Sequence, residues 1–137
     1  MRHLFASFLL AAVASASIEW QTDLKKALEI SNRLDKPLFI FVERNDPPCR
    51  WCEKMKKKTL SQKDISNLIN REFLPVIVDK NSIKIQEIPK PKYVPTIYIL
   101  HRGEIIKKII GYWSAEDFMT DLKEIQNSLK ERKTPHE

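Results

Sequence analysis

Residues 36–52 read KPLFIFVERNDPPCRWC and carry most of the structural information in this chain. The apolar run 38–42 contains no polar residue, which is typical of a strand buried on both faces. Turn-forming residues, two of them prolines, fill positions 44–48, and we expect a loop there. Cys49 and Cys52 then stand at the expected start of a helix.

Cys49 and Cys52 are the only cysteines of the chain, and two residues separate them. A disulfide over so short a span removes little chain entropy and is a poor structural staple. The same spacing at a helix start suits a dithiol that opens and closes during a reaction. A closed zinc site needs four ligands, usually Cys and His. Beyond the two cysteines, the chain after residue 16 has only His101, in a hairpin expected on the far side of the site, and His136, in the tail. We therefore expect no metal and no organic cofactor.

Residues 1–16 have the pattern of a signal peptide. A basic start is followed by the apolar run 4–13 and by Ala14-Ser15-Ala16, the small-x-small form of a cleavage site. The alternative is an uncleaved membrane anchor, but the run is much shorter than the ~20 residues of a spanning helix. We expect export to the bacterial periplasm, an oxidising compartment in which disulfides persist.

The charge pattern points to a solvated surface. The formal net charge is +6, and the densest basic run, residues 54–58, lies where the helix after the cysteines is expected to end. Lysines there complement the helix dipole. We interpret the run as a solvated helix face and expect no nucleic-acid partner.

The rest of the chain alternates between helical and extended patterns, and residues 80–93 fit neither. The expected helices are 20–35, 49–60, one that begins near Ser61 and one that begins near Ser114. The expected strands are 73–78, 96–100 and 105–110 in addition to 38–42, and the last two form a hairpin. Strands linked through helices should be parallel and those of a hairpin antiparallel, so the sheet is mixed. We expect one domain over residues 17–130 and a polar tail over 131–137.

Local signals refine this outline. Ser61 and Asp64, and likewise Ser114 and Asp117, have the spacing of a capping box at a helix start. Pro75 lies inside the second expected strand and demotes it to an edge position or a strand start, because proline cannot donate to a central ladder.

Several separate features of the chain resemble the thioredoxin superfamily, over nearly all of the sequence beyond residue 16. They are Lys36-Pro37 before an apolar strand, the CxxC at a helix start, Val94-Pro95-Thr96 at the opening of the third strand, and the chain's only glycines, Gly103 and Gly111, near the final hairpin. The resemblance implies an α/β thioredoxin fold: a mixed four-stranded central sheet with helices on both faces.

Within the superfamily the chain is most similar to small exported thioredoxin-like proteins of bacterial envelopes. Their CxxC is often followed by a helix rich in lysine and methionine, as in residues 53–56 here. Two departures stand out. Trp51 lies between the cysteines rather than before them, and Phe41 occupies the position at which thioredoxins bury a carboxylate beneath the dithiol, with Glu43 the nearest acid.

The resemblance implies a role for each residue around the dithiol. Cys49 attacks and Cys52 resolves, and the helix start and the charge of Arg50 should lower the pKa of the Cys49 thiol. Val94 and a cis Pro95 should pair with a substrate strand; an ordinary trans proline is the alternative. Trp51 contacts substrate or simply packs over the loop.

The expected function is thiol–disulfide exchange on exported proteins, of a reductase or isomerase type rather than an oxidase. The expected partners are thiols or disulfides of exported proteins and a redox partner in the membrane or envelope, and we expect a monomer. The alternative is a thioredoxin-like binding module in which the cysteines form a static disulfide. A peroxidase is a weaker third alternative, since no peroxide-activating constellation is evident.

Overall fold

The computed structural model describes residues 17–84 and 87–133. The signal sequence expected over residues 1–16 lies outside this range. In chain order the elements are α1 (Leu24–Leu34), β1 (Leu38–Glu43), α2 (Arg50–Lys54), the π-helical turn η1 (Met55–Thr59), α3 (Lys63–Glu72), β2 (Leu74–Asp79), the 3₁₀ turn η2 (Lys80–Ser82), β3 (Thr96–His101), β4 (Glu104–Ile110) and α4 (Ala115–Lys133). No helix in the described ranges has the length and apolar character needed to cross a bilayer.

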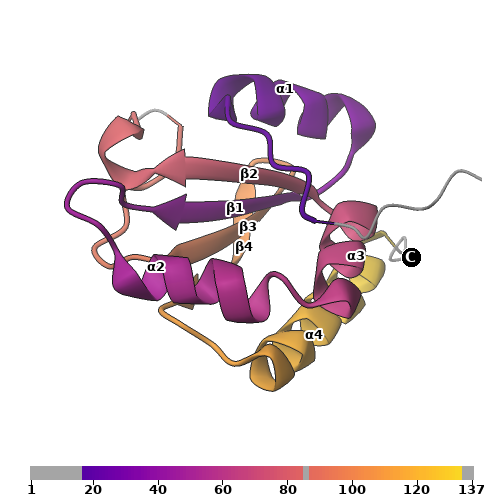
Figure 1. Cartoon of the computed structure of the whole chain (residues 1–137). Helices are drawn as coiled ribbons and strands as arrows, with labels where there is room; N and C mark the ends of the chain where they lie inside the picture. The colour runs from indigo at the N-terminus through magenta and orange to yellow at the C-terminus, as the bar shows by residue number, and fades with distance from the viewer. Residues whose placement is uncertain (1–16, 85–86, 134–137) are drawn as a thin grey trace, which may run out of the picture.

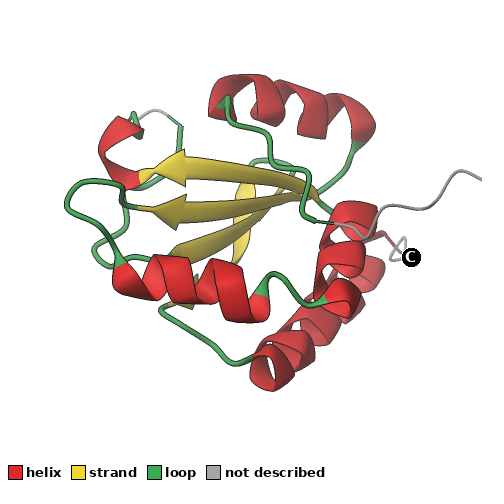
Figure 2. Cartoon of the chain, viewed as in Figure 1, coloured by secondary structure: helices red, strands yellow, loops and turns green. Residues whose placement is uncertain are grey.

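One mixed sheet organises the domain, with strand order β2-β1-β3-β4. The β1–β2 pair is parallel, and the β1–β3 and β3–β4 pairs are antiparallel. Helix α1 covers one face, while α2 with η1, α3 and α4 cover the other (Figures 1 and 2). The predicted fold class, a mixed four-stranded sheet with helices on both faces, is confirmed.

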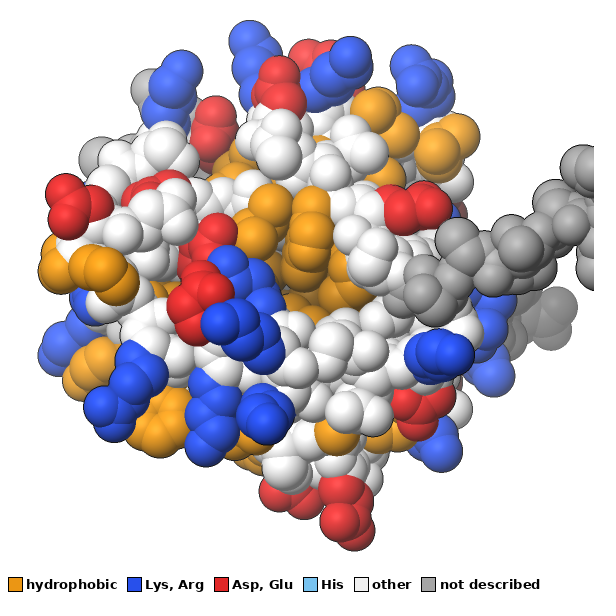
Figure 3. Space-filling model, viewed as in Figure 1, with side chains coloured by type: hydrophobic (Ala, Val, Ile, Leu, Met, Phe, Trp, Pro, Cys, Tyr) orange, Lys and Arg blue, Asp and Glu red, His pale blue; other side chains and the backbone are white. Residues whose placement is uncertain are grey.

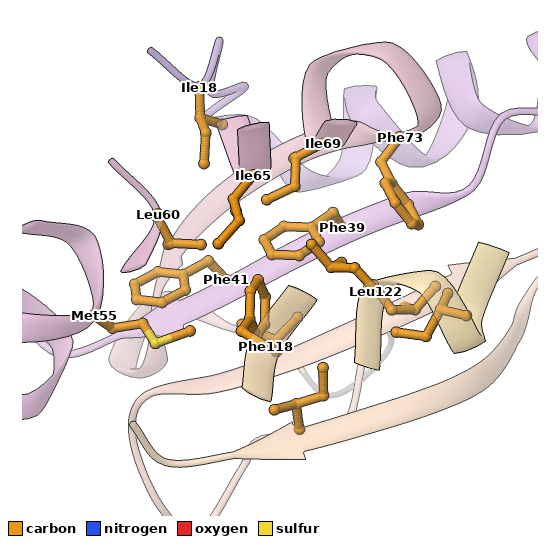
Figure 4. Close-up of a cluster of buried hydrophobic side chains, with 14 of the residues drawn as sticks. Ile18, Phe39, Phe41, Met55, Leu60, Ile65, Ile69, Phe73, Phe118 and Leu122 are labelled. Atoms are coloured by element: carbon orange, nitrogen blue, oxygen red, sulfur yellow. The ribbon is translucent and has the colours of Figure 1, made fainter. Parts of the chain in front are cut away.

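Strand β1 is the central element of both cores. All six of its residues are buried. Phe39 and Phe41 point to the face covered by α2, α3 and α4, where they meet Met55, Phe73 and Phe118 (Figure 4). The alternate residues of the strand belong to the smaller core beneath α1. The uninterrupted apolar run follows from this two-sided burial.

The edge position predicted from Pro75 is confirmed, because β2 ends the sheet order. Its outer side is partly covered by the segment before α1. Gln21 N donates to Pro75 O at 2.8 Å, and Ile77 N donates to Gln21 O at 2.9 Å. These bonds hold residues 20–21 extended, so the expectation of a helix from residue 20 is wrong. Helix α1 starts at Leu24, where the Asp23 carboxylate caps Lys26 N at 3.1 Å.

The two predicted capping boxes have different outcomes. At α4, Ser114 Oγ accepts from Asp117 N at 3.3 Å, as expected of an N-cap serine. At α3 the prediction is wrong: the cap residue is Gln62, and the Ser61 hydroxyl instead donates to Lys57 O of the preceding turn. The pattern failed there because the helical turn of η1 directly before Ser61 offers its own free carbonyl groups.

Helix α4 continues to Lys133 and so includes the first three residues of the expected polar tail. A side-chain network at this end of the sheet accounts for the extension. Arg132 Nε donates to His101 Nδ1 at 3.2 Å, and Arg132 also pairs with Glu104. His101 Nε2 lies 3.1 Å from Asp35 Oδ1. Because Nδ1 accepts from Arg132, the proton of the neutral ring is on Nε2 and is donated to Asp35.

Arg102 completes the network with two hydrogen bonds of 2.9 Å to the Asp35 carboxylate. These bonds and the charge of Arg102 hold the pKa of Asp35 at about 2. The network therefore joins the end of α1, the hairpin and the end of α4. In the β3–β4 turn itself, Arg102 and Gly103 have positive φ values of 54° and 77°, a conformation that glycine adopts without steric cost.

We expect the domain to lose stability as the pH falls below 6.5, the ordinary pKa of histidine. Burial lowers the pKa of His101, and the positive charges of Arg102 and Arg132 add to this against the opposing charge of Asp35. A depressed pKa means that the unfolded chain binds the proton more readily, so stability is complete above 6.5 and is lost as the pH falls through the folded-state pKa. Urea unfolding at pH about 5 and about 7.5 measures the difference.

The His101→Gln variant provides the control, since it keeps a side chain of similar reach without titrating. Its pH dependence over the same interval should be flatter than that of the parent chain. An equal slope in both proteins would assign the acid sensitivity to other groups.

Candidate active site around the Cys49–Cys52 disulfide

Cys49 and Cys52 form a disulfide at the start of α2, with Cα atoms 5.2 Å apart. Cys49 is the N-cap residue, with extended backbone angles, and its Sγ accepts a hydrogen bond from Cys52 N at 3.1 Å. Two prolines precede it, at the end of the turn over residues 45–48. The exposed fraction is 5% for Cys49 and 1% for Cys52, so the first cysteine is the more accessible.

The segment before β3 packs against the same buried cluster as the cysteines. The Val94–Pro95 peptide bond is cis, and so is Asp46–Pro47 in the loop before the cysteines, a cis bond that we did not expect from the sequence. Val94 is half-buried and packs against the cluster of buried residues that contains both cysteines. Pro95 O accepts from Gly111 N at 2.8 Å, which joins this segment to the loop after β4.

Gly111 has a φ of 86°, a backbone conformation that other residues adopt only with strain. It starts the loop that runs beneath the helix of the cysteines. Thr59 Oγ1 donates to Trp113 O at 2.6 Å, and Trp113 N donates to Met55 Sδ at 3.5 Å. These long-range bonds fix the loop against η1, the turn that directly follows the helix of the cysteines.

Trp51 is exposed to 48% and lies against Tyr112, with ring centroids 5.9 Å apart. Lys54 Nζ is 5.1 Å from the centre of the Trp51 ring and 4.7 Å from that of Tyr112. Arg50 stacks on the same indole, with Cζ at 5.7 Å. Sequence reasoning placed Arg50 and Trp51 at the site but missed Lys54 and Tyr112. An aromatic residue directly after Gly111 was the available signal for the latter.

Glu43, the acidic residue of β1, is paired with a lysine and is not a free carboxylate. Glu43 is buried and accepts from Lys56 Nζ at 2.6 Å, and Lys56 also bonds to Glu53 at 2.8 Å. Burial alone would lower the pKa of Lys56, but its hydrogen bonds and the charges of the two glutamates outweigh this and raise it. The hydrogen bond from Lys56 lowers the pKa of Glu53. Phe41, at the position where thioredoxins hold a carboxylate, is fully buried in the apolar core.

A hollow of about 480 Å³ lies on the other side of Lys56, between the segment before α1 and the end of the cysteine helix. Ile18, Trp20 and Leu60 line it together with Lys56 and Lys63, and its apolar floor is visible near the centre of Figure 3. Neither cysteine lines this hollow. This hollow is therefore not part of the disulfide site.

Within the described residues, no group of three or more His, Cys, Asp or Glu side chains could hold a metal ion. Cys49 and Cys52 are bonded to each other, and His101 lies in the network at the hairpin end of the sheet. His136 lies outside the described residues.

The fold and the disulfide at a helix start define a member of the thioredoxin superfamily of thiol–disulfide oxidoreductases. The chain belongs to the Thioredox_DsbH family, described as "Protein of unknown function, DUF255", whose profile matches residues 3–94. This match includes both cysteines and Val94 and leaves out Pro95, the β3–β4 hairpin and α4.

Solved structures support the fold. A thioredoxin from Thermus thermophilus superposes with a TM-score of 0.65 at 20% identity, covering 80% of this chain and 87% of that one. A structure titled "DsbH Oxidoreductase" gives a TM-score of 0.62 at 18% identity, covering 88% and 93%. Spermatogenesis-associated protein 20 from Rattus norvegicus is 27% identical over 63 residues, which are 46% of this chain and 8% of that protein.

Proposed function

We propose that this chain catalyses thiol–disulfide exchange on exported proteins, as a reductase or isomerase rather than an oxidase. One observation carries the proposal: the Cys49–Cys52 disulfide lies at the start of helix α2, with Cys49 as its N-cap residue. The hydrogen bond from Cys52 N to Cys49 Sγ supports Cys49 as the attacking group. A thiolate accepts such a bond more strongly than a thiol does, which lowers the pKa of the thiol.

The reaction balances with the two cysteines and one substrate disulfide. The Cys49 thiolate attacks a substrate sulfur, a mixed disulfide forms, and one substrate thiolate leaves. Cys52 then loses its proton and attacks Cys49 Sγ, which releases the second substrate thiolate and closes the Cys49–Cys52 disulfide. Two electrons pass to the substrate, and a dithiol partner in the membrane or envelope must return them.

The backbone of Val94 is proposed to pair with the substrate chain, and Trp51 to contact it from the other side. Arg50 adds a permanent positive charge next to Cys49 in the sequence and favours the thiolate. The apolar pattern of residues 1–16 supports location in the periplasm, where the chain would act as a monomer.

A second function has its own support. Both cysteines are nearly inaccessible in the disulfide form, which favours a binding module with a static disulfide. In that case the segment around Val94 would hold a partner without any exchange.

A redox titration in glutathione buffers separates the two functions. For the exchange enzyme we expect reversible opening of the disulfide, with a reduction potential between about −270 and −120 mV. Alkylation of the free thiols, read as a mass shift, measures the reduced fraction. A disulfide that stays closed at every glutathione ratio, while the chain remains folded, would favour the binding module.

A further inference from the structure

Exposed aromatic rings, each with a cation over it, lie on the helix that carries the cysteines and directly before Val94. We define the site rim as Arg50, Trp51, Lys54, Lys92, Tyr93 and Tyr112. Trp51 and Tyr93 are exposed to 48% and 57%, respectively. Exposed aromatic rings combined with arginine are the composition typical of protein–protein contact surfaces. Figure 3 shows hydrophobic and basic side chains alternating over the start of the helix that carries the cysteines.

Ring contacts hold the cations of the rim in place. Lys54 Nζ lies over Trp51 and Tyr112, and Lys92 Nζ lies 5.5 Å from the centre of the Tyr93 ring. A cation positioned in this way has already lost part of its side-chain freedom, so pairing with a carboxylate costs less entropy.

The three cations of the rim are Arg50, Lys54 and Lys92, and within the described residues none of them forms an ion pair. Lys56, in η1 directly after α2, is instead paired with two carboxylates. The balance of charge favours an anionic partner. Residues 50–59 contain Arg50 and four lysines but only one acid, Glu53, and that acid is paired with Lys56. Asp46 is the one acid of the loop before the cysteines, and Arg44 of the same loop offsets it.

We propose that the site rim binds acidic polypeptide segments next to the cysteines on which the chain acts. The inference rests on the proposed exchange activity, in which a polypeptide substrate brings a reactive sulfur to Cys49 together with flanking carboxylates. Acidic side chains on either side of the substrate cysteine pair with Lys54 and Lys92, while its backbone lies along Val94. A nucleic acid would satisfy the charges but supplies no disulfide.

The test uses three disulfide peptides that differ only in flanking Glu, Gln or Lys residues, with hydroxyethyl disulfide as an uncharged small substrate. We expect kcat/KM for the Glu peptide to exceed that for the Gln peptide by about 3- to 10-fold at low salt, with the Lys peptide slowest. Raising the ionic strength to about 0.5 M should remove most of the difference.

The double variant Lys54→Glu/Lys92→Glu should reverse the order of the Glu and Lys peptides. The matched control is Lys25→Glu/Lys123→Glu, which makes the same change in net charge at exposed positions of α1 and α4. The control should keep the order of the parent chain. Arg50 is left unchanged because its charge lies next to Cys49 and bears on the chemistry itself.

The outcomes separate the two levels of the proposal. Turnover of hydroxyethyl disulfide with equal kcat/KM for all three peptides would overturn the acidic preference and leave the exchange activity standing. No turnover of any disulfide would instead refute the proposed function. A single-stranded oligonucleotide that inhibits turnover of the Glu peptide more strongly than polyglutamate of equal charge would assign the rim to nucleic acid and overturn the inference.

Discussion

Replacing Cys49 with serine should reduce thiol–disulfide exchange to the uncatalysed rate, a loss of about a thousandfold or more. Cys49 is the more exposed of the pair and accepts the hydrogen bond from Cys52 N, so it is the sulfur that a substrate can reach. A serine hydroxyl cannot form the mixed disulfide. Turnover of a disulfide peptide, followed through the thiols it releases, measures the loss.

Cys52→Ser is the matched variant, because it removes the other sulfur with the same change of atom. It should lose turnover equally but accumulate a mixed disulfide through Cys49, visible as an adduct on a non-reducing gel and by mass. Accumulation in Cys49→Ser rather than in Cys52→Ser would reverse the two roles. Adducts in neither variant would count against exchange chemistry.

Replacing Phe39 with alanine should lower the free energy of unfolding by about 3–5 kcal/mol, the largest loss we expect from one core substitution. Phe39 is fully buried and is the second residue of β1. Its ring lies 5.9 Å from that of Phe73, 6.2 Å from that of Phe118 and 6.1 Å from that of Trp20. Truncation leaves a cavity among these rings, which belong to three other segments and cannot all collapse onto it (Figure 4).

Urea unfolding measures the loss, and Leu34→Ala serves as control. Leu34 is exposed to 59% at the end of α1, so its truncation should change stability by less than about 0.5 kcal/mol. Where Phe39→Ala does not fold, the Phe39→Leu variant keeps most of the volume and should still be destabilised by more than Leu34→Ala. Similar losses for the buried and exposed positions would contradict the central role of this core.

Much of the architecture could be predicted because its signals are local. The run 38–42 has no polar residue, and its burial on two faces follows from that composition. Pro75 indicated the edge position of β2, and Ser114 marked the start of α4. The spacing of Cys49 and Cys52 allowed a disulfide at the start of a helix, and the structure contains one.

Where sequence reasoning was wrong, the deciding contact came from a distant segment or from a competing local group. Trp20 continued the helical pattern of α1, but Gln21 pairs with β2 and draws these residues out of the helix. Ser61 matched a capping box, but the carbonyl of Lys57 took its hydroxyl. Apolar periodicity records which face is buried and carries no information on which partner competes for a backbone group.

The sequence by itself determined the mixed α/β sheet and the position of the dithiol. Only the tertiary structure decided what surrounds the dithiol: the pairing of Glu43 with Lys56, and the contact of Trp51 with Tyr112 beneath Lys54. The physical reason is the range of the interactions. Strand burial and many helix caps depend on neighbouring residues, whereas these contacts join the cysteine helix to β1 and to the loop after β4, and they form only once the layers have packed.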